Sequence, residues 1–520
     1  MLDDIRTGID LALRLPGYLR RIIDLDQGTD LIRRRLERRA ADFLALAREV
    51  IYDHPSSPYR SLLAAAGCEL RDLERLVRDE GLEDALAALW RQGVYLTIDE
   101  FKGRQPLVRG SLRLQVEPSQ FRNPLGRQHI MSASGGSRGQ RVPVALDLAD
   151  LHVRALHTLI PILARGGAEW ALAVWKVPGG ALPTLLQHAV GPVLPARWFL
   201  MVAPARSGAP ARYHWSARTV YWVSRLAGRP LPAGQRVSLE DPTPILRWMS
   251  SVLAEGGTPH LDTFPGAAVE LCRAARAAGV DLEGAHLSLP GEPLTEARLA
   301  TIRATGAHAV SRYSTSETGP LGGGCLAPAT ADDQHVFEDA HAFIQAGEEP
   351  TGRLPADALL VTSLRRSASL VLLNVALGDR GDLSARPCGC PLETVGWGRH
   401  LSGIRSYEKL TAHGMTFHDI DVVRVLEHTL PARFGGGPND YQLVEAVARD
   451  GRPRLILRVH PRVPARPPED VARAFLDAIS GGGPAQRIMG QVWRDARVVE
   501  VIREEPVTSA GGKILHVIGR

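Results

Sequence analysis

A loop rich in glycine and hydroxyl residues has the composition of a phosphate-binding segment. It covers Ser132–Gln140 and reads SASGGSRGQ. Backbone amides in such a loop can approach phosphate oxygens because glycine has no Cβ, and serine hydroxyls and Arg138 add donors and charge. The loop is not a Walker A motif, because no Gly-Lys-Ser/Thr ending follows. The same composition suits a surface loop, and the loop alone does not decide between the two.

Three further segments carry groups suited to a nucleotide. In Tyr313–Glu317 a glutamate follows hydroxyl residues, so it can hold Mg²⁺ beside a phosphate chain, and the tyrosine can flank a base. A short turn carries Asp379 and Asp382, and a carboxylate at a strand end can bind the hydroxyls of a ribose. Near the end of the chain, Lys513 follows two glycines and is free to reach a distant site. Each segment alone also reads as an ordinary loop or turn.

The order and spacing of these segments resemble those of the adenylate-forming superfamily of acyl-CoA synthetases, peptide-synthetase adenylation domains and luciferase. Ser134–Gly139 is similar to the phosphate loop Ser-Gly-Gly-Ser-Thr-Gly, with arginine in place of threonine. Leu289–Leu294 resembles the Gly-Glu-Pro segment beside the adenine. Tyr313–Glu317 resembles Tyr-Gly-x-Thr-Glu, with serine at the second and fourth positions. The resemblance covers roughly residues 125–520.

Within the superfamily, the phenylacetate–CoA ligase branch is the most similar. Its members place a cysteine after the Tyr…Glu motif, then His-x-x-Glu-Asp, then a Cys-x-Cys turn. The matching residues here are Cys325, His335–Asp339 and Cys388-Gly-Cys390. The resemblance implies a structural Zn²⁺ bound by Cys325, His335, Cys388 and Cys390, because three thiolates and one imidazole complete a tetrahedral set. The alternative is that all four are ordinary core or turn residues.

The resemblance implies an AMP-forming acid–thiol ligase. It would adenylate a small carboxylic acid with ATP and Mg²⁺ and pass the acyl group to coenzyme A or to the phosphopantetheine of an acyl carrier protein. The implied catalytic residues are Lys513 at the carboxylate and α-phosphate, Arg405 near the ribose or phosphate, and Glu317 on Mg²⁺. The implied ATP-binding residues are Ser134, Gly135, Gly136, Ser137, Gly139, Gly291, Glu292, Pro293, Tyr313, Ser316 and Asp382, with Asp379 as the alternative to Asp382. Walls of the acid pocket are expected around Thr263-Phe-Pro and Ser288-Leu-Pro.

The segment Arg405–Gly414 resembles the hinge motif of the superfamily, which usually reads Arg-x-Asp-Asp and ends in glycine. Here Tyr407 replaces the hinge aspartate and Glu408 replaces the next acid. We therefore expect a biased domain rotation, while the adenylating half is unaffected.

Two other functions stay open. An amine acceptor would make the protein an amide-forming ligase, which the sequence does not distinguish from a thiol ligase. A catalytically degenerate adenylating fold would act as a binding or regulatory module. The presence of Lys513, Glu317 and Asp382 argues against degeneration.

Hydrophobic periodicity places these motifs on three regions. A chain of 520 residues exceeds one core, so at least two domains are expected. Residues 1–125 read as a mostly helical segment, with one amphipathic helix over 30–52 and a strand after Gly93. Residues 126–404 read as a large α/β adenylating domain, with buried strands at 358–363 and 369–376 and a helix ending at Gly279.

The rest of the chain, 405–520, reads as a small mobile α+β domain. Strands are expected at 455–460 and 496–502, with a helix over 470–479 between them.

Composition narrows the partners and the compartment. The net charge of +5 is mild, and the basic run Arg33–Arg39 lacks interleaved aromatic residues, so no nucleic-acid partner is expected. No apolar run approaches the length of a membrane span. Acidic residues near the start argue against a secretory signal, and five cysteines do not suggest a disulfide framework. The expected location is the cytoplasm.

Overall fold

The computed structural model describes residues 2–127, 129–133, 143–201, 211–348, 353–407, 411–412, 415–416, 419–447, 453–480, 494, 499–508 and 514–518. Its largest element is a twelve-stranded sheet, half parallel and half antiparallel. In order, the parallel half is β7 (Gly234–Arg236), β6 (Arg197–Leu200), β5 (Ala171–Lys176), β8 (Pro259–Asp262), β9 (His286–Pro290) and β10 (His308–Thr315). The antiparallel half continues with β11 (Gly319–Gly324), β12 (Gln334–Val336), β16 (Arg399–Ser406), β15 (Val375–Ala385), β14 (Ala358–Ser363) and β13 (His341–Gln345).

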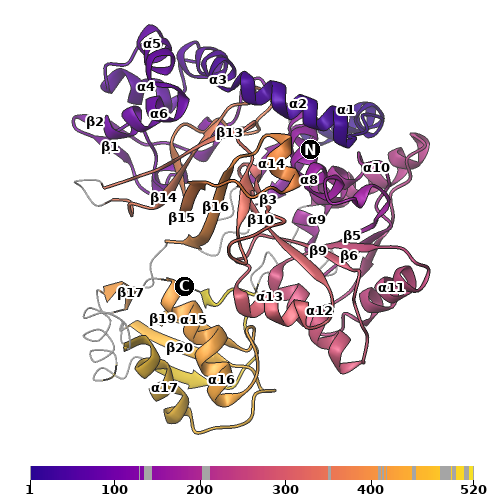
Figure 1. The fold of residues 1–520 in the computed structure, drawn as a ribbon. Coiled ribbons are helices and arrows are strands. Elements are labelled where there is room, and N and C mark those ends of the chain that lie inside the picture. Colours follow the sequence, from indigo (N-terminus) through magenta and orange to yellow (C-terminus); the bar gives the residue numbers. More distant parts are fainter. Residues whose placement is uncertain are drawn as a thin grey trace.

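Helices connect and cover the parallel half, which gives the α/β class predicted from the sequence (Figure 1). They are α8 (Leu148–Leu163), α9 (Pro178–His188), α10 (Ala211–Leu226), α11 (Thr243–Ala254), α12 (Pro265–Ala277) and α13 (Glu296–Arg303). A proline at the first helical turn starts α9 and α12, where its missing N–H costs nothing. As predicted, α12 gives way at Gly279, whose φ of 65° suits glycine.

The antiparallel half shares one apolar core with helices from the N-terminal part of the chain. These are α1 (Leu2–Leu19), α2 (Leu25–Glu37), α3 (Arg39–Ala47), α4 (Pro58–Ala65), α5 (Leu70–Glu80), α6 (Leu82–Arg91) and α7 (Ile98–Phe101), followed by the hairpin β1 (Leu107–Arg109) and β2 (Leu112–Leu114). Among the described residues, no helix is both long and apolar enough to cross a bilayer.

Three expected elements differ from the structure. The single helix over 30–52 is broken at Arg38, and its last five residues form a π-helix. The strand after Gly93 is one bridge from Leu96 to Val375, because the helix cap at Thr97 turns the chain into α7. The strand over 358–363 is correct, but the next strand starts at Val375 instead of 369. Apolar runs mark burial, and tertiary contacts decide which buried residues pair.

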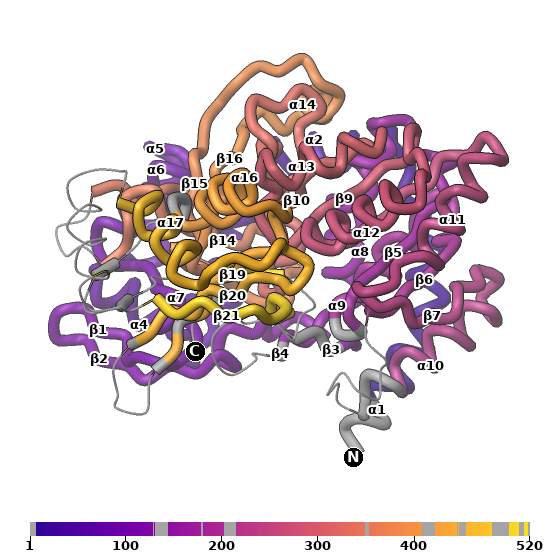
Figure 2. Tube along the Cα trace, turned by 90° about the horizontal axis from the view of Figure 1, so that it is seen from below, coloured from indigo at the N-terminus to yellow at the C-terminus, as the bar shows by residue number. Residues whose placement is uncertain are grey.

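A second, smaller sheet lies in the C-terminal part of the chain, below the large sheet in Figure 1 and nearest the viewer in Figure 2. Its order is β21 (Val499–Ile502), β20 (Pro453–Val459), β19 (Tyr441–Val447) and β22 (Val517–Ile518). The helices α15 (Asp419–Arg424), α16 (Leu430–Phe434) and α17 (Pro468–Ser480) complete an apolar core of its own. We call residues 419–518 the C-terminal unit, and the domain boundaries near 125 and 404 stay predictions.

Candidate active site

The carboxyl ends of three parallel strands bring predicted site residues to one edge of the large sheet. Thr263 follows β8, Gly291–Pro293 follows β9, and Ser316 and Glu317 follow β10. In open α/β sheets, ligands bind in the crevice outside the carboxyl ends of the strands. Strand pairing therefore joins segments that lie far apart in the sequence.

The tyrosine of the predicted nucleotide segment contacts a carboxylate from the antiparallel half. Tyr313 is buried, and its hydroxyl donates a hydrogen bond of 2.8 Å to Asp379. The pKa of Tyr313 is raised well above its ordinary value, mainly because the hydroxyl is buried and also because the Asp379 carboxylate lies beside it. The backbone N–H of Tyr407 donates to Gly378 beside this pair, at 2.9 Å.

This contact distinguishes Asp379 from Asp382, the two acids that the sequence offered as ribose ligands. A bulge in β15 at Gly381 shifts the strand register between Arg380 and Asp382. Asp379 and Asp382 therefore lie in different surroundings. Asp382 is exposed, and its carboxylate lies beside Gly403 instead of Tyr313. Asp382, our first choice from the sequence, is thus separate from Tyr313, and Asp379, the alternative, is the acid that contacts it. The bulge has no sequence signal beyond the glycine itself.

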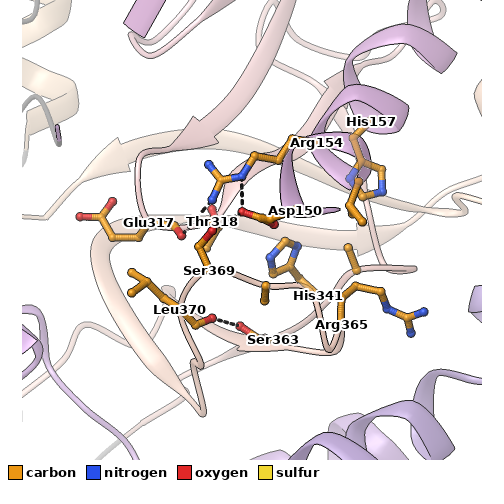
Figure 3. Close-up of a pocket in the computed structure, with 13 residues that line it drawn as sticks. Asp150, Arg154, His157, Glu317, Thr318, His341, Ser363, Arg365, Ser369 and Leu370 are labelled. Atoms are coloured by element: carbon orange, nitrogen blue, oxygen red, sulfur yellow. Dashed lines mark hydrogen bonds and ion pairs between the residues drawn. The ribbon is translucent and has the colours of Figure 1, made fainter. Parts of the chain in front are cut away.

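Arg154 on α8 holds the turn that carries Glu317 (Figure 3). Its guanidinium donates to the backbone oxygens of Ser316 and Glu317 at 3.5 and 3.4 Å, and to the Asp150 carboxylate at 2.8 Å. Ser369 donates a 2.6 Å hydrogen bond to the same Asp150. The sequence reading missed Arg154, because nothing in the sequence links α8 to this turn.

Glycine 319 makes that contact possible. Its φ is 80°, and a Cβ there would lie 2.7 Å from Cδ of Arg154. The Glu317 carboxylate accepts no hydrogen bond from any residue that the structure describes, so it is available to a cation. This is the property that a Mg²⁺ ligand requires.

The carboxylate of Glu292 binds the C-terminal tail. One oxygen accepts the backbone N–H of Ile514 at 3.0 Å, and the other accepts the N–H of Gly266 at 3.0 Å and the Arg298 guanidinium at 2.8 Å. Arg298 also donates to the backbone oxygen of Ile514 at 3.1 Å. Ile514 is the residue after Lys513, so this contact fixes the chain next to the predicted catalytic lysine. Both carboxylate oxygens of Glu292 thus accept hydrogen bonds from other residues of the protein, so a nucleotide would contact the backbone of Glu292.

Arg298 lies at the centre of a buried ionic network between the large sheet and the C-terminal unit. Its Nε lies 3.3 Å from Glu427, which also contacts His516 at 2.8 Å. Burial raises the pKa of Glu427, but the contacts with His516 and Arg298 outweigh burial and lower the pKa to about 2. A second contact joins Arg273 to Asp440 at 2.7 Å. Because charges buried in this way are costly to separate, the network defines one preferred seating of the C-terminal unit.

Several predicted residues lie outside the described residues. They are the phosphate loop Ser134, Gly135, Gly136, Ser137 and Gly139, the hinge residues Glu408 and Gly414, and Lys513. The flanks of the loop are described: β3 (Ile130–Ala133) pairs with β4 (Pro143–Leu146), and Ala133 is opposite Pro143.

Arg405, predicted near the ribose or phosphate, is mostly buried and ion-paired. Its guanidinium lies 2.9 Å from the Asp332 carboxylate, and its backbone pairs with Arg380 across β15 and β16.

The polar side chains of the two segments expected to line the acid pocket form hydrogen bonds with other residues of the protein. The Thr263 hydroxyl donates to the backbone of Trp175 at 2.8 Å, and the Ser288 hydroxyl lies 2.9 Å from His260.

The four residues predicted to bind zinc come together between β11, β12 and the turn after β15. Nε2 of His335 lies 3.1 Å from the Cys390 sulfur and 3.6 Å from the Cys388 sulfur. Against the effect of burial, the contact with His335 lowers the pKa of Cys390 to about 6. Nδ1 of His335 lies 2.6 Å from the backbone oxygen of Trp397, an outer contact that orients a metal-binding imidazole. Cys325 lies within 4.8 Å of His335 and Cys388, but the group of mutually close donors contains His400 in place of Cys390.

A fifth donor, His400, was not predicted. Donor atoms of Cys325, His335, Cys388 and His400 all lie within 4.8 Å of one another. His400 is opposite His335 in the pairing of β12 with β16, and its Nδ1 lies 2.8 Å from Asp333. Its Nε2 is buried without a hydrogen-bond partner among the described residues, as expected for an atom that faces a cation. The sequence gives no sign that His400 lies near the cysteines, because the pairing of β12 with β16 brings it there.

No family model and no curated protein matches the chain. Among solved structures, it is similar to a 2-hydroxyisobutyryl-CoA ligase in complex with 2-HIB-AMP and CoA, at 16% identity over 93% of this chain and 90% of that one, with a TM-score of 0.48. It is similar to the anthranilate CoA ligase AuaEII at 14% identity, over 79% and 68% of the two chains, with a TM-score of 0.45. It is also similar to the amide bond synthetase McbA from Marinactinospora thermotolerans, at 14% identity over 93% of this chain and 97% of that one, with a TM-score of 0.41. At such low identity the residues of the site must themselves support any assignment of function.

Proposed function

We propose that the protein is an adenylate-forming ligase of the phenylacetate–CoA ligase type, which converts a carboxylic acid and ATP to acyl-AMP and pyrophosphate. The observation that carries this proposal is the pair of hydrogen bonds that the backbone of Ile514 forms with Glu292 and Arg298. It brings the chain next to Lys513 to the edge of the sheet where Tyr313 and Glu317 lie. A lysine there would neutralise charge that develops on the α-phosphate as the carboxylate attacks.

Each remaining group has a role in this reaction. Asp379, held by Tyr313, would accept hydrogen bonds from the ribose hydroxyls. Glu317, fixed through its backbone by Arg154, would hold Mg²⁺, which neutralises phosphate charge when bound. The loop with Ser134 and Ser137 would cradle the distal phosphates. Positioning and cations supply the catalysis, so no acid–base pair is required.

We further propose that the Cys/His cluster holds one structural Zn²⁺. Donor atoms of Cys325, His335, Cys388 and His400 lie within 4.8 Å of one another, and the Cys390 sulfur lies 3.1 Å from His335, so these five residues offer the four donors that a closed tetrahedral site needs. The acyl acceptor is a thiol, either coenzyme A or the pantetheine of a carrier protein, in a cytoplasmic setting.

Acid-dependent ATP–pyrophosphate exchange tests the activity directly. Across a library of aryl and aliphatic acids, we expect exchange with at least one acid and none without acid. Absence of exchange, with ATP still bound, would indicate a binding module instead. Supplying preformed acyl-AMP with thiols and with amines then identifies the acceptor, and an amide product would replace the thiol ligase by an amide-forming one.

A further inference from the structure

We propose that α10 and the adjoining α1 form a docking surface for a lipid bilayer with anionic headgroups. Five large apolar side chains define this surface, which we call the α1/α10 patch. The exposed fractions are 69% for Trp215, 63% for Trp222, 86% for Leu226, 57% for Ile9 and 75% for Leu13. Of the nine large apolar side chains that are exposed among the described residues, five lie here. Such a concentration marks an interaction site instead of ordinary surface.

The helical period turns the patch directly away from the protein. On α10, Val220 and Ser224 are buried, while Trp215, Trp222 and Leu226 lie seven and four residues apart on the opposite side. The helices α1 and α10 lie side by side at the edge of the molecule, far from the C-terminal unit (Figures 1 and 2). The patch is therefore separate from the candidate active site.

The charge around the patch is positive. The α10 sequence has three arginines and no aspartate or glutamate, and α1 has two arginines and three aspartates, so the two helices together carry a formal charge of +2. Arg218 is exposed between the two tryptophans, and Arg225 stacks on Tyr221 with its Cζ 3.4 Å from the ring centre. Neither arginine forms an ion pair with a carboxylate among the described residues. Tryptophan and leucine flanked by arginine is the composition of helices that lie in the interface of anionic membranes.

The shape and charge favour a bilayer over a protein partner. The side chains protrude instead of lining a groove, so a rigid partner would need a matching cavity, whereas headgroups rearrange around them. A second copy joined by a two-fold axis would present another α10, which has no carboxylate to pair with Arg218 or Arg225. Anionic headgroups instead complement the charge.

Co-sedimentation of the full chain with vesicles tests the proposal. We expect binding to phosphatidylglycerol–phosphatidylcholine vesicles, weakened by salt, and little binding to phosphatidylcholine alone. Arg218→Glu should weaken binding by about tenfold or more, because each arginine near such a surface contributes about fivefold. The double variant Trp222→Ala/Leu226→Ser should lose binding. Leu125→Ser, exposed at 47% and outside the patch, serves as the matched control and should bind normally.

Further measurements distinguish loss of membrane binding from loss of folding and from self-association. Circular dichroism and unchanged acid-dependent exchange would show that the variants fold. Equal binding by the double variant, or no binding to anionic vesicles, would overturn the proposal. Self-association in sedimentation velocity that the double variant abolishes would assign the patch to a second copy and overturn it too.

Discussion

At the scale of single residues, the site depends on a lysine whose chain is anchored by its neighbour. If Lys513 sits at the α-phosphate, Lys513→Ala should lower ATP–pyrophosphate exchange about 100-fold or more, because a preorganised cation is lost from the transition state. ATP affinity, and acyl transfer from supplied acyl-AMP, should change much less. The measurements are exchange rates and an ATP titration, with Lys102→Ala as control. Equal exchange rates would remove Lys513 from the mechanism.

The anchor itself gives a second prediction. In Glu292→Gln, the new amide group must face a donor, either the N–H of Ile514 or that of Gly266, and Arg298 loses its charge partner. Losses of this kind amount to about 1–3 kcal/mol, so exchange should fall roughly tenfold or more while acyl transfer is maintained. Glu270→Gln, which disturbs a different contact between the units, should leave exchange close to normal. Equal effects of the two changes would contradict a specific role of Glu292.

At the scale of elements, the proposed zinc site would hold the turn between β15 and α14 (Pro391–Val395). We expect about one Zn²⁺ per chain in protein purified without chelator. The double change Cys388→Ser/Cys390→Ser should remove it and lower the melting temperature, because a closed zinc site contributes directly to folding. Cys272→Ser, at a buried cysteine on α12, should retain the metal. Full zinc occupancy in the double variant, by elemental analysis, would exclude this cluster.

At the scale of the whole molecule, we expect the orientation of the C-terminal unit to depend on the predicted hinge and on the ionic network around Arg298. Tyr407 is half-buried and packs on the core of the large sheet. Exposing such a ring on rotation costs on the order of 1–3 kcal/mol, so we expect the observed seating to be favoured about tenfold or more.

Tyr407→Asp should therefore raise the ratio of thioester formation to acyl-AMP formation while exchange stays nearly constant. Tyr407→Phe retains the ring and should behave like the natural protein. Both half-reactions would be measured, with coenzyme A and with a carrier protein. An unchanged ratio would place the pivot elsewhere between Gly403 and Gly414.

The sequence by itself determined the local chemistry and the class of fold. Hydroxyl and glycine loops, the Tyr313–Glu317 segment and the three cysteines with His335 are visible as residue types at fixed spacing, and periodicity locates strands such as 358–363 and helices such as α12. Only the tertiary structure decided which groups meet. The bulge at Gly381 separated Asp382 from Tyr313 and left Asp379 in contact with it, strand pairing brought His400 to His335, and docking of the C-terminal unit brought Ile514 to Glu292. Periodicity and composition report the burial of a residue, whereas its partners depend on contacts between residues up to hundreds of positions apart, for which a single sequence carries no signal.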